Sequence, residues 1–266
     1  MAHSFPTHTP KLMVSVTDSV ATVAINNPGK RNALDLPMWK ALPPVMAALD
    51  GDPDVRIVIL RGAGDEAFTS GADIAEFETV RRNAEDGRLY EAANEAAFWA
   101  VARCSKPVVA MIRGFCLGGG FGLALSCDLR VASENAVFGI PAARLGIGYP
   151  PGAMNLVTAA IGAPAARDLF YTARRIGAQE AKELGVLQRV VPDGELEATV
   201  LALARDIAGN APLTIRAAKA AIDEAVGLAH SDVDPAALAD LCFESADAAE
   251  GRKAFLEKRS PVFTGR

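Results

Sequence analysis

The chain has 266 residues, half of them apolar and 22% charged, with a formal net charge of −5. This length and composition predict one sizeable folded core rather than a disordered protein. The acidic balance, without a basic cluster interleaved with aromatics, excludes nucleic acid as an expected partner. No apolar run reaches bilayer-spanning length, and residues 1–11 lack the apolar segment of a signal peptide. We therefore expect no membrane partner.

The number and spacing of the cysteines and histidines limit the kinds of catalytic and metal site that the chain can form. The cysteines contain no C-x-x-C pair and predict reduced thiols in a cytoplasmic protein. The histidines are few and widely separated, so they give no basis for a Ser-His-Asp triad or a metal site. Any reaction must then rest on backbone donors or on other side chains. The residues concerned are Cys104, Cys116, Cys127, Cys242, His3, His8 and His230.

The N-terminal third predicts strands and a helix. Alternating residues over 11–26, interrupted at 17–19, predict a β-hairpin. A polar loop follows, and residues 37–50 predict a helix with Pro37 in its first turn. The run VRIVILR at 55–61 is typical of a strand buried on both faces.

Residues 67–74, AFTSGADI, predict a strand end and a small-residue turn leading towards a helix. Local pattern alone favours an ordinary turn here, with Asp73 as the helix cap. A helix is then predicted over 86–103, with Phe98 and Trp99 adding bulk to the core. Residues at three-to-four spacing predict its buried face. They are Leu89, Ala93, Ala97, Ala100 and Cys104.

A second strand–turn–helix pattern contains three consecutive glycines. Residues 107–112 predict a buried strand, Gly118–Gly120 a turn, and 121–126 the start of a helix. Such turns can aim unpaired backbone N–H groups at a ligand. The spacing fits neither a P-loop nor a dinucleotide fingerprint, so a tight turn under a helix remains the alternative.

The rest of the chain changes character near Pro192. Short strands are predicted at 129–132, 136–139 and 186–191, with helices at 153–161, 164–172 and 178–184 and a Pro/Gly loop at 140–151. Four helical patterns follow, at 195–209, 212–226, 235–248 and 250–259. We predict an α/β protein with a core over residues 1–195 and a helical region over 196–266.

Taken together, these segments resemble the enoyl-CoA hydratase/isomerase, or crotonase, superfamily. The resemblance implies an α/β spiral of β-β-α turns with a C-terminal helical trimerisation region. It also implies acyl-CoA thioesters as ligands, no cofactor apart from the CoA of the substrate, and a homotrimer or dimer of trimers. The matching stretches are 26–34, 55–74 (VRIVILRGAGDEAFTSGADI), 106–133 (KPVVAMIRGFCLGGGFGLALSCDLRVAS), 138–147, 177–181, 184–186 and 254–259.

The same resemblance assigns the two glycine-containing turns to catalysis. It implies that the backbone N–H groups of Ala72 and Gly119 form an oxyanion hole around the thioester carbonyl. Two fixed donors stabilise a developing enolate oxygen without reorganisation, and losing one such donor typically costs about 10²–10³ in rate.

Residues that bind CoA are also implied by the resemblance. Those expected at the nucleotide end are Arg31 and Ala33, and those on the adenine side are Ser70, Asp73 and Ile74. Phe255 and Lys258 match a C-terminal pair that often reaches the CoA bound to a neighbouring subunit.

The chain departs from the family pattern at two catalytic positions. Hydratases of this family use two glutamates to activate water, and Gly122 and Ala142 occupy those positions here. Each positioned acid or base typically contributes about 10²–10⁴ in rate. Ordinary hydration should therefore be poor unless another side chain enters the site. Glu76 and Glu78 are weaker candidates than Tyr149 for the acid or base that would replace the two glutamates.

Tyr149 is the first substitute that the sequence offers. Residues 143–149 are similar to the Ala-x-Leu-Gly-x-x-Tyr segment of methylmalonyl-CoA decarboxylases, although those carry a histidine where this chain has Ala72. Three interpretations follow: enolate chemistry without glutamates, such as decarboxylation of a malonyl-type thioester; hydration or isomerisation with a relocated acid/base; or a silent acyl-CoA binder. A loop aromatic packed on the core is the structural alternative for Tyr149.

Overall fold

The computed structural model describes residue 5 and residues 7–266, so His3 lies outside the described residues. Two sheets organise the chain. The larger has the strand order β1-β2-β3-β5-β7-β10 and the smaller β4-β6-β8-β9. The strands of the larger sheet are β1 Leu12–Thr17, β2 Val20–Ile25, β3 Ile57–Gly62, β5 Val108–Ile112, β7 Leu129–Ser133 and β10 Arg189–Val191. Those of the smaller are β4 Ala67–Thr69, β6 Phe115–Leu117, β8 Val137–Gly139 and β9 Arg175–Gly177.

The strands alternate between the two sheets along the chain. β3, β5 and β7 pair in parallel in the larger sheet, and β4, β6 and β8, which follow each of them, pair in parallel in the smaller. Helices connect each pair of strands to the next, so the chain advances as a spiral. This arrangement confirms the predicted α/β class and its β-β-α turns.

Helices surround the sheets. The longer ones are α1 Leu36–Gly51, α3 Ala84–Ala102, α6 Pro151–Thr172, α8 Leu196–Ala208, α9 Pro212–Ala225, α10 Pro235–Glu244 and α11 Ala246–Glu257. The shorter ones are η1 Pro28–Lys30, η2 Ile74–Glu76, α2 Phe77–Val80, α4 Gly119–Leu125, α5 Ala142–Leu145, α7 Ala178–Glu183 and η3 Asp193–Glu195. None of the helices in the described part of the chain is long and apolar enough to cross a membrane.

Two helical segments differ from the sequence prediction, whereas the break predicted between residues 161 and 164 is confirmed. The two helices predicted at 153–172 meet in α6 across Gly162, whose φ of 74° interrupts the helical backbone. The loop predicted at 140–151 contains the short helix α5. The break between the last two helices falls at Ser245, because its side chain accepts a hydrogen bond from the Ala248 N–H and caps α11.

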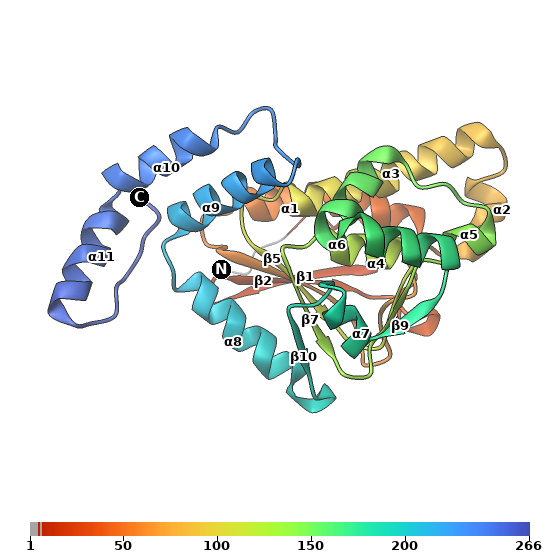
Figure 1. The fold of residues 1–266 in the computed structure, drawn as a ribbon, viewed down its shortest axis with the longest axis horizontal. Coiled ribbons are helices and arrows are strands. Elements are labelled where there is room, and N and C mark those ends of the chain that lie inside the picture. The colour runs from red at the N-terminus through yellow and green to blue at the C-terminus, as the bar shows by residue number, and fades with distance from the viewer. Residues whose placement is uncertain (1–4, 6) are drawn as a thin grey trace.

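Two apolar layers enclose the larger sheet. One contains α1, α3, α4 and α6, and the other contains α8. Leu196, Val200 and Ala204 of α8 pack against β2, β3, β5 and β7, so α8 contributes to the core. α10 and α11 extend away from the sheets (Figure 1). The division at residue 195 and the role of the helices in trimerisation stay predictions.

The buried face of α3 matches the predicted one only in part: Ala97 and Cys104 are buried as predicted, and Phe98 joins the core. Leu89 is 66% exposed, whereas Tyr90, Asn94, Phe98 and Val101 are buried. Phe98 and Tyr90 face the aromatic residues of α1 and α2: the Phe98 ring lies edge-on to Trp39, and the Tyr90 hydroxyl accepts a hydrogen bond from Trp39 Nε1. The many alanines of this helix fit either face, so the bulky aromatics decided the orientation.

Candidate active site

Two glycine-containing turns lie in contact at the ends of neighbouring parallel strands. β4 ends at Thr69 and β6 at Leu117, and both turns contain a glycine with positive φ: Gly71 at 97° and Gly118 at 53°. A Cβ on Gly71 would lie 2.7 Å from the Leu117 carbonyl oxygen and 3.4 Å from the Gly119 nitrogen. The backbone that precedes Ala72 therefore approaches the Leu117 carbonyl more closely than a side chain would allow, and this places it in contact with Gly119.

The N–H groups of Ala72 and Gly119 are unpaired in this arrangement. The bridge between Leu34 and Ala72 uses the neighbouring groups: Leu34 N–H donates to the Gly71 carbonyl, and Asp73 N–H donates to the Leu34 carbonyl. Gly119 begins α4, where the first N–H groups have no partner within the helix. In the described part of the chain, neither the Ala72 nor the Gly119 N–H donates a hydrogen bond.

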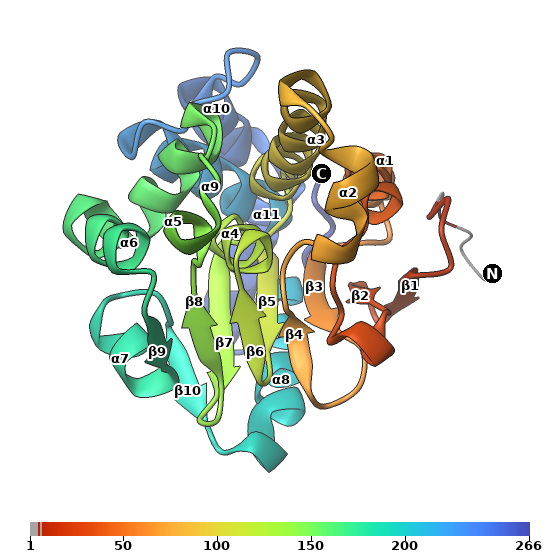
Figure 2. The ribbon, with the colours of Figure 1, turned by 90° about the vertical axis from the view of Figure 1, so that its right-hand side faces the viewer.

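Both residues line a small cavity of about 70 Å³. Its walls come from the two turns, α2, α3, α5 and the loop after α5, which gather at one end of the molecule (Figure 2). A single water needs about 10–15 Å³ of such space, so the cavity has room for a short acyl group. It brings together six residues singled out from the sequence: Ser70, Ala72, Ile74, Gly119, Ala142 and Tyr149.

The two positions expected to carry glutamate in a hydratase have different surroundings. Ala142 lines the cavity at the start of α5. Gly122 is buried under the ring of Phe98, and a Cβ at Gly122 would lie only 2.6 Å from Phe98 Cζ. Phe98 thus fills the space into which a side chain at position 122 would extend.

Tyr149 is another residue that lines the cavity. Its ring stands edge-on against Phe170, with 4.9 Å between ring centroids. Burial raises the pKa of Tyr149 well above its usual value, so the hydroxyl stays protonated. Within the described residues this hydroxyl has no hydrogen-bond partner. Tyr149 can therefore donate a hydrogen bond or a proton.

Sequence reasoning missed three polar residues of the cavity wall, Arg81, Glu91 and Asn94. Arg81 follows α2, forms an ion pair with Glu91 of α3, and stacks over the rings of Phe77 and Tyr90 at 4.5 and 4.8 Å. Asn94 was missed because it does not belong to the predicted buried face of α3. The only signal in the sequence was its position one helical turn before Phe98.

Known proteins share this architecture. The profile of the enoyl-CoA hydratase/isomerase family matches residues 15–266. The chain belongs to the enoyl-CoA hydratase/isomerase family. A short-chain-enoyl-CoA hydratase of Clostridium acetobutylicum is 36% identical, over 90% of this chain and 92% of that protein. A crotonyl-CoA hydratase of Syntrophomonas wolfei is 35% identical, over 95% and 97%.

A solved structure gives the same result for the fold. The crystal structure described as an enoyl-CoA hydratase/carnithine racemase from Magnetospirillum magneticum superposes with a TM-score of 0.89 at 37% identity. The match covers 97% of each chain. The spiral of the family therefore extends through nearly the whole protein.

The residues predicted to bind the nucleotide of CoA lie in the turn that contains Gly71 and in the loop before α1 that is hydrogen-bonded to it. Arg31 is exposed, stacks over Phe115 at 5.1 Å and pairs with Glu66. Asp73 is buried, caps η2 and pairs with Lys30 at 2.6 Å. The Ser70 hydroxyl donates to the Lys30 carbonyl. Ala33 is buried and Ile74 is 55% exposed. Their roles towards CoA stay predictions.

The other candidates lie outside the cavity. Phe255, on α11, is 82% exposed, and Lys258 follows that helix, on the side of the molecule away from α2 and α5 (Figure 1). Their expected contact with a neighbour's CoA stays a prediction. Glu76 accepts a hydrogen bond from the Leu36 N–H, and Glu78 is exposed on α2. Both glutamates are absent from the cavity wall, as far as the described residues show.

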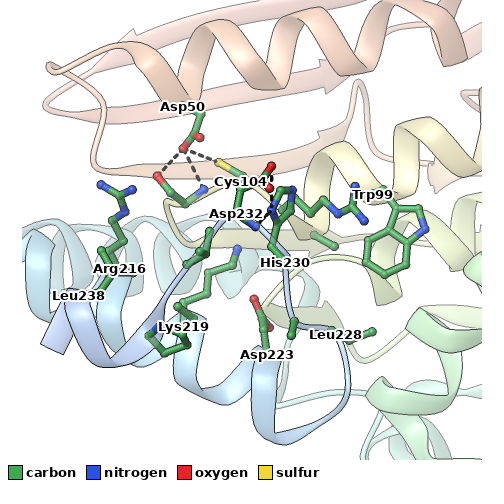
Figure 3. A pocket seen from close by; sticks show the side chains of 17 residues that line it. Asp50, Trp99, Cys104, Arg216, Lys219, Asp223, Leu228, His230, Asp232 and Leu238 are labelled. Carbon is green, nitrogen blue, oxygen red and sulfur yellow. Dashed lines mark hydrogen bonds and ion pairs between the residues drawn. The ribbon is translucent and has the colours of Figure 1, made fainter.

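A larger cavity, of about 290 Å³, lies between the end of α3 and the helices α9 and α10 (Figure 3). Asp50 accepts hydrogen bonds there from the Ser105 N–H and hydroxyl and from the Cys104 thiol. Lys219 pairs with Asp128 at 2.9 Å. Among the described residues, no cluster of His, Cys, Asp or Glu could hold a metal ion, here or elsewhere.

Proposed function

We propose that the enzyme acts on acyl-CoA thioesters through an enolate, which the N–H groups of Ala72 and Gly119 stabilise. The observation that carries the proposal is a pair of unpaired backbone donors, from two contacting turns, on the wall of one cavity. Membership of the enoyl-CoA hydratase/isomerase family supports the acyl-CoA substrate. Fixed donors stabilise a developing oxyanion without reorganisation. This stabilisation is the largest single contribution to the rate in many acyl-transfer enzymes.

We further propose that classical hydration is slow in this enzyme. Among the described residues, Glu91 is the one carboxylate that lines the cavity, and it is already paired with Arg81. Neither Gly122 nor Ala142 can activate a water. The general acid–base contribution of about 10²–10⁴ per group is then missing unless Tyr149 or Glu91 supplies it.

Decarboxylation of a malonyl-type thioester is the second candidate, and Tyr149 favours it. In that reaction the bond between Cα and the carboxylate breaks, CO₂ leaves, and the electron pair moves onto the thioester oxygen as an enolate. No general base is needed. The enolate carbon then takes a proton, which the protonated hydroxyl of Tyr149 can donate.

A panel of acyl-CoAs followed by mass spectrometry tests the proposal. Loss of 44 Da from malonyl- or methylmalonyl-CoA indicates decarboxylation, and gain of 18 Da by crotonyl-CoA indicates hydration (both are reactions through an enolate). Ala142→Glu adds a carboxylate to the wall and should raise hydration selectively. Binding of acyl-CoAs without any turnover would contradict the proposal and leave a silent acyl-CoA binder.

The assembly and location that we propose follow the family resemblance and the sequence. We expect a homotrimer or dimer of trimers in the cytoplasm. The exposed apolar side chains of α10 and α11, among them Phe243, Phe255 and Leu256, support an interface between copies. Light scattering of the purified protein would measure the number of chains.

A further inference from the structure

Three polar side chains of the small cavity have unused hydrogen-bonding capacity. Asn94 is only 6% exposed, yet its carboxamide bonds to no group among the described residues. The Nε of Arg81 is buried without a hydrogen-bond partner, although the far end of that guanidinium pairs with Glu91. The Tyr149 hydroxyl, unpartnered in the same part of the structure, completes the set.

Their origins and positions make this coincidence informative. Asn94 comes from α3, Arg81 from the end of α2, and Tyr149 from the loop after α5, and all three line the cavity that contains Ala72 and Gly119. Buried polar groups are almost always hydrogen-bonded in folded proteins. The Nε of Arg81 is an exception, and Asn94 and Tyr149 add to the same wall two more side chains without a partner among the described residues, so a ligand can complete these groups.

The position of Asn94 relates these groups to the reacting part of a substrate. A Cβ built on Gly119 would lie 3.2 Å from Asn94 Nδ2, so the carboxamide borders the proposed oxyanion hole. The thioester oxygen is already provided with two backbone donors. The three side chains that line the same cavity are therefore available to the acyl group next to the thioester carbonyl.

We propose that Asn94, Arg81 and Tyr149 form a specificity site for a short acyl group that carries a second oxygen acceptor. The inference rests on the proposed function, because it requires the thioester to occupy the Ala72–Gly119 site. A carboxylate, hydroxyl or keto oxygen can each accept from these donors. A plain hydrocarbon chain leaves all three unpaired and should therefore bind more weakly.

Three acyl-CoAs of equal carbon number separate the cases: butyryl-CoA, 3-hydroxybutyryl-CoA and succinyl-CoA. Isothermal titration calorimetry gives a dissociation constant for each on the full-length protein. We expect at least one oxygenated ligand to bind about tenfold more tightly than butyryl-CoA, as for one satisfied hydrogen bond. Preference for succinyl-CoA identifies a carboxylate, and preference for 3-hydroxybutyryl-CoA identifies a neutral oxygen.

Asn94→Leu, similar in shape but without polar atoms, should reduce that preference about tenfold by weakening the oxygenated ligand and not butyryl-CoA. Arg81→Lys keeps the charge opposite Glu91 and removes the Nε–H. The matched control is Leu89→Ala on the exposed face of the same helix, which should leave the ratio unchanged.

The inference is overturned if butyryl-CoA binds as tightly as both oxygenated ligands, or if Asn94→Leu leaves the ratio unchanged. In either case, the proposed function would still be supported if the enzyme turns over any acyl-CoA through an enolate and Gly119→Pro loses this turnover. If none of the three ligands binds, both proposals fall together.

Discussion

The small cavity at the two glycine turns and the cavity beside α9 and α10 differ in which of their polar groups are paired. In the larger one, Asp50 accepts hydrogen bonds from Cys104 and Ser105 (Figure 3). Lys219 is paired with Asp128.

In the smaller one, the N–H groups of Ala72 and Gly119, the side chains of Asn94 and Tyr149, and the Nε of Arg81 lack hydrogen-bond partners among the described residues. The larger cavity also contains side chains without a hydrogen bond or ion pair in the described part of the chain, such as Asp223. The comparison teaches that backbone donors held by two contacting turns, rather than volume, distinguish the smaller cavity as the candidate site.

The largest effect is expected where the smaller cavity loses a donor. Gly119→Pro removes one N–H at the first position of α4, where proline is tolerated. Turnover should fall about 10²–10³-fold because the oxyanion keeps only one donor. Steady-state kinetics measures the loss.

Gly119→Ala is the matched control for the proline substitution, since it retains the N–H and adds only a Cβ near Trp39 and Asn94. Equal turnover in the proline and alanine variants would refute the role of this donor. Circular dichroism should show that both variants are folded.

A smaller effect is expected where the ring of Phe98 packs against Gly122. Gly122→Ala places a Cβ 2.6 Å from Phe98 Cζ, and overpacking of this kind typically costs about 1–3 kcal/mol of unfolding free energy. Gly87→Ala in α3 meets no atom within 4 Å and should leave stability unchanged or raise it. Urea denaturation of both variants makes the comparison. A Gly122→Ala protein as stable as wild type would contradict the packing described here.

The smallest effect concerns the larger cavity and depends on pH. Burial raises the pKa of Asp223 to about 6 in the folded protein from an ordinary value of 3.8. The folded state therefore holds the proton more tightly, and stability falls as the pH rises from about 4 to 6. Asp223→Asn removes this ionisation, so the variant should be slightly more stable than wild type above pH 6 and equal below pH 4.

Thermal unfolding at pH 8 and pH 3.5 tests the Asp223 prediction. Because Asp223 is only half-buried, the gain should stay below about 1 kcal/mol after solvent screening. A variant that is less stable than wild type at pH 8 would show that attraction to Lys219 outweighs burial.

The sequence predicted most of the fold because its strands are continuous apolar runs and its turns carry glycines. Residues 57–62 and 108–112 became buried parallel strands, and Gly71 and Gly118 adopted the positive φ that their turns require. These features are local, so spacing and residue type reveal them.

The polar wall of the cavity could not be predicted in the same way. Arg81 and Glu91 are ten positions apart in a charged stretch that is typical of a solvated surface, and only tertiary packing brings them to the cavity. Asn94 was missed because the alanines of α3 allowed two orientations. Tyr90 and Phe98 selected the one that buries Asn94.

The most direct test of the central claim is the carbonyl stretch of a bound acyl-CoA labelled with ¹³C at the thioester carbon. Difference infrared spectroscopy compares the stretch on the protein with that in water. If the Ala72 and Gly119 N–H groups both donate to this oxygen, the stretch moves to lower wavenumber on binding, and Gly119→Pro reverses much of that shift. A bound carbonyl that absorbs as it does in water, or a shift that Gly119→Pro leaves intact, would contradict the account.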